Sequence, residues 1–188
     1  MNTPNKLTML RIFLIPVFIF FALSKNIPFN GFLALFIFII ASLTDLLDGH
    51  IARSRELITD FGKFLDPLAD KMLTSAAFIL FVSNGFMTPV AVIIIIAREF
   101  MVTSLRLIAA GDGNVIAANI WGKIKTVAQL SAIIAILFFN EEAIRPFVNN
   151  IISVNLLNSV LEWTVVAATV ISGILYLWSN RKLVNHRK

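Results

Sequence analysis

The chain has 188 residues, of which 58% are hydrophobic and only 14% are charged, with a formal net charge of +5. So much apolar surface excludes an ordinary soluble domain of this length, and the lipid bilayer is the expected solvent. The sequence has no cysteine, which excludes disulfides and thiolate chemistry and leaves oxygen and imidazole as the available metal ligands.

Six segments are apolar enough to be interpreted as membrane-spanning helices, because a span needs about 20 mostly apolar residues. They lie at residues 7–23, 31–48, 64–83, 88–108, 121–139 and 160–178. These segments use nearly the whole chain, so there is no room for a separate soluble domain. We therefore predict an all-α integral membrane protein with six transmembrane helices and a single domain, residues 1–188.

The first segment has a second interpretation, because positive charge followed by an apolar run is also typical of a secretory signal peptide. No small-residue cleavage site follows it, and Pro16 is unusual inside such a core. We therefore interpret this segment as a retained first helix.

Basic residues are distributed unequally between the two ends of the predicted helices. Of the 16 Lys and Arg residues, only Lys25 and Arg145 fall in the loops opposite the chain termini. The positive-inside rule therefore predicts a multi-pass protein of the cell membrane with both termini in the cytoplasm. The net positive charge is then explained by topology and by attraction to anionic lipids, without nucleic acid as a partner.

Six acidic side chains lie in residues 44–71, where the second segment passes into the third. Asp45 and Asp48 are spaced i, i+3 and Asp66 and Asp70 are spaced i, i+4, so each pair projects from one helical face. Four facing carboxylates would repel one another unless a cation lay between them, and all-oxygen ligation suits Mg²⁺, Mn²⁺ or Ca²⁺. We therefore predict a divalent metal site at the cytoplasmic edge of the membrane.

A simpler interpretation is that these acids only terminate helices in a cytoplasmic loop, and we prefer it for Glu56 and Asp60. The four aspartates are different, because a carboxylate close to the apolar core costs several kcal/mol unless it is paired or faces a wet cavity. Gly49 would let a ligand approach the backbone, and Gly62 would allow a tight entry into the third helix.

The same stretch has a characteristic spacing. It reads Asp45-x-x-Asp48-Gly49-x-x-Ala52-Arg53, then eight residues, then Gly62-x-x-x-Asp66-x-x-x-Asp70. This pattern resembles the signature of the CDP-alcohol phosphatidyltransferase family at every fixed position. The resemblance implies a six-helix membrane enzyme, usually a homodimer, that uses Mg²⁺ or Mn²⁺, as two ions, while an alcohol displaces CMP from a CDP-linked lipid.

The resemblance also implies roles for individual residues. Asp45, Asp48 and Asp66 would be metal ligands, and Asp70 would contribute as a further ligand or as the catalytic base. The residues expected along the nucleotide are Gly49, Ala52, Arg53, Gly62, Asn5 and Thr8.

Segments outside the signature narrow the choice of alcohol. The stretches "PNKLTMLRI", "FGKFLDPLADK", "REFMVTSLRL" and "WGKIKT" resemble those of the bacterial phosphatidylglycerophosphate synthases within this family, whereas the last third of the chain resembles them only as hydrophobic helices. The resemblance implies transfer of the phosphatidyl group from CDP-diacylglycerol to sn-glycerol 3-phosphate.

Four basic residues fit such a phosphorylated acceptor. Arg98 and Arg106 lie in the fourth segment, and Lys123 and Lys125 open the fifth. Arginine binds phosphate in a bidentate manner, so we predict that these residues form the acceptor phosphate site. Two alternatives stay open: the lysines could anchor the helix at the membrane interface, and Glu99 could be a structural partner of Arg98.

Three rival functions remain at this point. A cardiolipin synthase of the same family could share several of these segments. A divalent-cation transporter would also place carboxylates in the membrane, but at mid-depth rather than at one face. An Asp-rich prenyltransferase would need a second Asp-rich motif, which we do not find. Finally, we expect Tyr176 and Trp178 in an interfacial aromatic belt.

Overall fold

The computed structural model describes residues 3–24, 26–55, 60–111 and 119–181, with the side chains of residues 3–6, 45–55, 60–67 and 70 outside the description. These ranges form helices and no strands, which confirms the all-α class. The helices are α1 (Thr3–Leu23), α2 (Asn30–Arg55), α3 (Asp60–Ser83), α4 (Pro89–Gly111), α5 (Ile120–Phe139), α6 (Arg145–Asn149) and α7 (Val154–Ser179).

A long helix covers each of the six predicted segments, and the five-residue α6 lies in the connection before the last one. Within the described residues, α5 and α7 are long and apolar enough to cross a membrane. Shorter apolar stretches occupy Leu7–Leu23, Asn30–Thr44 and Lys71–Ser83. The number of spans, the cytoplasmic side of the termini and the single domain stay predictions.

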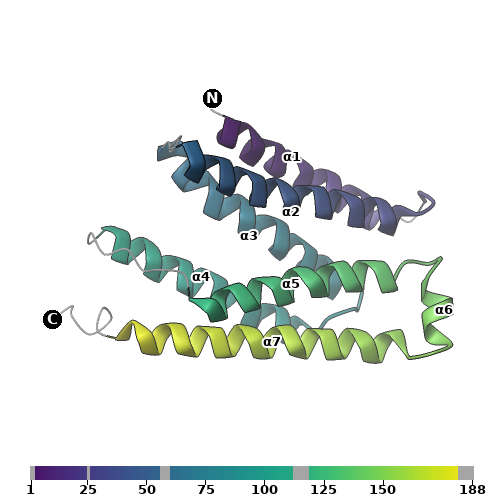
Figure 1. Cartoon of the computed structure of the whole chain (residues 1–188). Coiled ribbons are helices and arrows are strands. Elements are labelled where there is room, and N and C mark those ends of the chain that lie inside the picture. Colours follow the sequence, from purple (N-terminus) through teal and green to yellow (C-terminus); the bar gives the residue numbers. More distant parts are fainter. Residues whose placement is uncertain (1–2, 25, 56–59, 112–118, 182–188) are drawn as a thin grey trace.

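The long helices form a bundle of two groups (Figure 1). Helices α1, α2 and α3 pack together, as do α4, α5 and α7, and the groups meet through contacts of α2 with α5 and of α3 with α4 and α5. The helices alternate in direction. The start of α1, the end of α2, the start of α3, the end of α4 and the end of α7 therefore lie at one end of the bundle, which we call the signature end. The opposite end, which carries α6, is the far end.

Aromatic and small side chains fill the centre of the bundle. Phe18 and Phe38 are fully buried with their ring centroids 5.7 Å apart. Ala34 and Ala77 are also fully buried, and such small residues let helices approach closely. The outer surface is apolar as well: Phe13, for example, is 67% exposed. A bundle that is apolar inside and outside suits a lipid environment.

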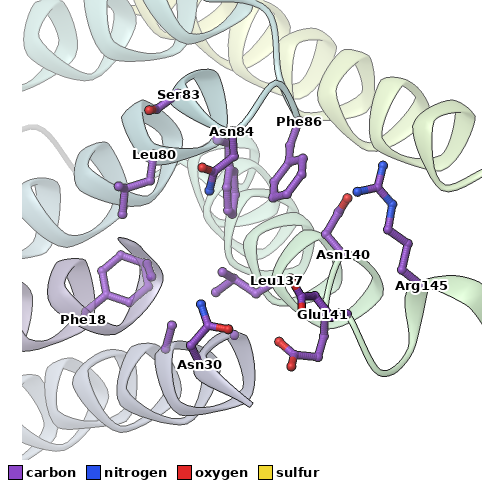
Figure 2. Close-up of a pocket in the computed structure, with 15 residues that line it drawn as sticks. Phe18, Asn30, Leu80, Ser83, Asn84, Phe86, Leu137, Asn140, Glu141 and Arg145 are labelled. Carbon is purple, nitrogen blue, oxygen red and sulfur yellow. The ribbon is translucent and has the colours of Figure 1, made fainter. Parts of the chain in front are cut away.

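Polar side chains close the far end around a cavity of about 410 Å³ (Figure 2). Asn140 and Asn158 exchange two hydrogen bonds, of 2.9 and 3.1 Å, which tie the end of α5 to α7. The Glu141 carboxylate accepts hydrogen bonds from the backbone N–H groups of Gly31 and Phe32, and Figure 2 shows Glu141 reaching toward the start of α2. This contact satisfies donors that a helix N-terminus leaves unpaired.

Candidate active site

The signature aspartates lie on two consecutive helices at the signature end. Asp45 and Asp48 are in α2, and Asp66 and Asp70 are in α3, so the backbone is helical at all four positions, as their spacing requires. Their side chains lie outside the described residues, and the metal site therefore stays a prediction. Among the side chains that the structure describes, no group of three or more His, Asp or Glu residues comes together. The donor chemistry of the signature alone carries the metal prediction: four oxygen ligands on neighbouring helices fit Mg²⁺ or Mn²⁺.

Most of the predicted nucleotide-binding side chains also lie outside the described residues, namely Gly49, Ala52, Arg53, Gly62 and Asn5. Thr8 is described and is almost completely buried on α1. One turn further along α1, Arg11 is fully buried where α1 packs against α2 and α3. Sequence reasoning used Arg11 only as a topology marker. An arginine inside an apolar helix was the sequence signal for a buried cation.

A cavity of about 470 Å³ opens beside the signature end, between α3, α4, α5 and α7. All four predicted acceptor residues line it, two from α4 and two from α5, namely Arg98, Arg106, Lys123 and Lys125. Lys71 also lines the cavity and directly follows Asp70 in α3. The lining of the cavity therefore begins, in the sequence, one residue after the signature.

Glu99 holds the inner part of this cavity together. Its carboxylate forms an ion pair with Lys125, lies 3.4 Å from Nη1 of Arg98 and lies 4.0 Å from Nζ of Lys71. Lys125 is buried against it, so this lysine does not extend outward as an interfacial anchor. Arg98 also donates a 2.6 Å hydrogen bond from Nη2 to Oγ of Ser172. One carboxylate thus orders three cations from three helices.

Helix α7 fits closely against Arg98. A Cβ at Gly173 would lie 3.1 Å from Cγ of Arg98, which is closer than almost any real contact of this kind. The glycine therefore permits the approach that lets Arg98 reach Ser172. Sequence reasoning assigned no role to Ser172 or Gly173, because neither belongs to a motif and their importance depends on which helix packs beside α4.

The outer part of the cavity carries Arg106 and Lys123, whose side chains are exposed. The guanidinium of Arg106 lies over the ring of Tyr176, 5.5 Å from its centroid. Tyr176 itself is only 3% exposed and lines the cavity, so its predicted place in an exposed aromatic belt is wrong. Trp178 is 69% exposed, as expected. Two positions along a helix turn the side chain by about 200°, so the two aromatic residues occupy opposite faces of α7.

Three buried donors on the cavity wall have no hydrogen-bond partner among the described residues. They are Nε of Arg98, Nε2 of Gln129 and Oη of Tyr176. The lining also contains five cations and one carboxylate, a formal charge of +4. Buried donors without partners are costly, so this wall is complementary to a ligand that is anionic and rich in acceptor oxygens.

Comparison with known proteins agrees with this chemistry. Residues 1–174 match the sequence profile of the family described as CDP-alcohol phosphatidyltransferase. The chain is 45% identical over 190 residues to the CDP-diacylglycerol–glycerol-3-phosphate 3-phosphatidyltransferase of Bacillus subtilis (strain 168), covering 95% of each chain. The protein of the same name from Rickettsia bellii (strain RML369-C) is 35% identical, and the match covers 96% of each chain. The one from Haemophilus influenzae is also 35% identical, and the match covers 95% of this chain and 89% of its own. The chain is a phosphatidyltransferase that belongs to the CDP-alcohol phosphatidyltransferase family.

Proposed function

We propose that this protein transfers the phosphatidyl group from CDP-diacylglycerol to sn-glycerol 3-phosphate, giving phosphatidylglycerophosphate and CMP. The observation that carries the proposal is the basic cavity, which begins one residue after the signature and is lined by every residue predicted for the acceptor phosphate. The names of the relatives from Bacillus subtilis, Rickettsia bellii and Haemophilus influenzae support the same acceptor.

The reaction is a displacement at phosphorus. A hydroxyl oxygen of glycerol 3-phosphate attacks the phosphorus that carries the diacylglycerol, the bond from that phosphorus to the oxygen of CMP breaks, and CMP leaves. The hydroxyl proton goes to Asp70 in its role as base. Asp45, Asp48 and Asp66 would hold one or two Mg²⁺ or Mn²⁺ ions, which when bound neutralise the pyrophosphate and stabilise the leaving group.

The charge and size of the cavity favour a small phosphomonoester as acceptor. Arg106 and Lys123 are the exposed cations of the cavity, whereas Arg98 and Lys125 already contact Glu99. We assign the phosphate to the exposed pair and the reacting hydroxyl to the side of Lys71, next to Asp70. Phosphatidylglycerol, the acceptor of a cardiolipin synthase, carries one phosphodiester charge and two acyl chains. It would neutralise less of the excess positive charge than a phosphomonoester, and its acyl chains do not suit the polar wall.

The proposed location is the cytoplasmic membrane, with several spans and the active site facing the cytoplasm. The excess of Lys and Arg at the signature end supports this orientation. The two helices that could cross a membrane support the membrane location. The start of α1 and the end of α7 lie at that same end (Figure 1). The homodimer rests on the family resemblance, and crosslinking in native membranes would test it.

A product assay with the purified full chain tests the proposal. CDP-diacylglycerol and Mg²⁺ would be combined with glycerol 3-phosphate, glycerol, serine, inositol or phosphatidylglycerol, each in a separate reaction. We expect CMP release and a phosphatidyl product with glycerol 3-phosphate only. Cardiolipin formation from phosphatidylglycerol would contradict the acceptor assignment, and metal uptake into vesicles without any lipid turnover would favour a transporter.

A further inference from the structure

Two buried side chains line the basic cavity between α3, α4, α5 and α7, which we call the acceptor cavity, and each has an unpaired hydrogen-bond donor. Gln129 on α5 and Tyr176 on α7 are each only 3% exposed, and neither Nε2 of Gln129 nor Oη of Tyr176 finds a partner in the described residues. Both residues line the cavity. Since an unsatisfied buried polar group destabilises the fold, these two groups call for a ligand or for ordered water.

Each donor lies beside a cation of the proposed acceptor site. Gln129 follows Lys125 by four residues, one turn along the same face of α5. The ring of Tyr176 lies under the guanidinium of Arg106. The two donors therefore approach one cavity from two helices, next to the charges that would attract a phosphate.

The identity of residue 176 strengthens the argument. The chain has 17 phenylalanines and a single tyrosine, and that tyrosine is buried at this cavity. Phenylalanine would offer the same ring to Arg106 and would avoid burying a hydroxyl. Tyr176 lies just beyond residues 1–174, which match the family.

A neighbouring residue supplies the matched comparison. Thr169 lies about two turns before Tyr176 on α7, and its buried Oγ1 also has no partner among the described residues. It is not one of the residues that line the cavity. The lack of a hydrogen-bond partner alone therefore does not identify a ligand-binding residue. A position on the cavity wall beside a cation is also needed.

We infer that Tyr176 and Gln129 are acceptor-binding residues that donate hydrogen bonds to oxygen atoms of the bound phosphorylated polyol. Tyr176 binds the phosphate that Arg106 holds, and Gln129 binds deeper in the cavity. This inference rests on the proposed function. It extends the acceptor site from α4 and α5 to the last helix.

The test uses Tyr176→Phe, which keeps the ring and removes only the hydroxyl, and Gln129→Leu, which keeps the approximate volume. With each substrate varied at saturating levels of the other, we expect each variant to raise the KM for glycerol 3-phosphate about tenfold. The KM for CDP-diacylglycerol should not change. Thr169→Val, the control, should alter neither value.

A binding measurement independent of turnover accompanies the kinetics. Thermal unfolding of the detergent-solubilised protein would be followed as glycerol 3-phosphate is added. In Tyr176→Phe, the concentration that gives half of the maximal stabilisation should rise by the same factor as the KM.

The possible results separate the inference from the proposed function. Unchanged KM and unchanged stabilisation in both variants would overturn the inference and leave the proposed function intact, because the donors would then be satisfied by water. Equal rises in both KM values would also overturn it and assign the side chains a structural role. If the unaltered protein neither uses nor binds glycerol 3-phosphate, the proposed function fails first.

Discussion

The two ends of the bundle both bury polar side chains, but they differ in whether these side chains have hydrogen-bond partners. At the far end, the buried polar groups form hydrogen bonds with one another. Asn140 bonds to Asn158, and the Glu141 carboxylate accepts from backbone N–H groups of α2. The Glu162 carboxylate accepts from the backbone N–H and the hydroxyl of Thr88. Beside the signature end, the acceptor cavity leaves buried donors of three side chains without partners in the described chain. Buried polar groups hold helices together where they satisfy one another, and they mark a ligand site where they do not.

Charge separates the two regions as well. The far-end cavity is lined by Glu141, Glu142 and a single cation, Arg145, whereas five cations and one carboxylate line the acceptor cavity. Burial and the neighbouring Glu142 raise the pKa of Glu141 above its usual value. The far end therefore disfavours an anion, and the acceptor cavity attracts one. Substitutions at the far end should affect stability. Substitutions around the signature end should affect turnover and substrate binding, except at Glu99, whose ion pairs join helices and should affect stability.

The largest effect is expected at the signature. Asp70→Asn should lower kcat by about 10²- to 10⁴-fold while metal affinity changes little, because a general base contributes roughly that factor. Asp66→Asn should weaken the binding of Mg²⁺ as well as turnover. Metal titrations followed by activity would distinguish the two. Equal losses of metal affinity would make Asp70 one more ligand, and full activity after chelation with verified metal depletion would contradict the metal site.

A smaller but still large effect is expected for Glu99, which connects the cations of the inner cavity. Glu99→Gln would leave Lys125 buried without its carboxylate and should lower the free energy of unfolding by about 3 kcal/mol. Glu142→Gln is the matched control, because Glu142 is exposed, and it should have almost no effect. Thermal unfolding in detergent measures both. Equal stability of the two variants would mean that the ion pairs of Glu99 contribute little.

At the far end, Gly31→Ala should destabilise the protein without changing either KM. The added Cβ would collide with the Glu141 carboxylate and displace it from the start of α2, at a cost of about 1 to 2 kcal/mol. Gly111→Ala is the control, since a Cβ at Gly111 meets nothing within 4 Å. An altered KM for glycerol 3-phosphate in Gly31→Ala would show that the two ends are coupled.

The smallest effect concerns pH. Because the pKa of Glu141 is raised in the folded protein, its protonated form is favoured there, and its contribution to stability is present at low pH. That contribution is lost as the pH rises from the usual glutamate range through the raised value. Glu141→Gln should therefore show a flatter dependence of unfolding temperature on pH across this window. A steeper dependence would mean that the ionised form is the stabilising one.

The sequence predicted the features that depend on local pattern. Long apolar runs located the helices, and the spacing of the aspartates placed them on α2 and α3. The basic residues of α4 and α5 were predicted to meet, and they line one cavity. The helices and the positions of the aspartates follow from residues that are neighbours in the chain. The shared site of the basic residues was predicted from their charge and from the acceptor that the resemblance implies.

The features that were missed depend on contacts between distant segments. Tyr176 looked like an interfacial aromatic residue, because its sequence context does not show that its face of α7 packs beside Arg106. Ser172 and Gly173 have no motif, and their importance follows only from the reach of Arg98. The contact of Glu141 with Gly31 joins the α5–α6 connection to the start of α2, and no local pattern encodes it.

The central claim is that the basic cavity with its unpaired hydrogen-bond donors is the acceptor site. A steady-state comparison of Arg106→Ala with the unaltered enzyme tests this claim most directly. Each substrate is varied at saturating levels of the other. Loss of one charged phosphate contact should raise the KM for glycerol 3-phosphate by about 10- to 150-fold and leave the KM for CDP-diacylglycerol nearly unchanged. A rise in the KM for the lipid instead, with no change for glycerol 3-phosphate, would place Arg106 at the nucleotide and contradict the account.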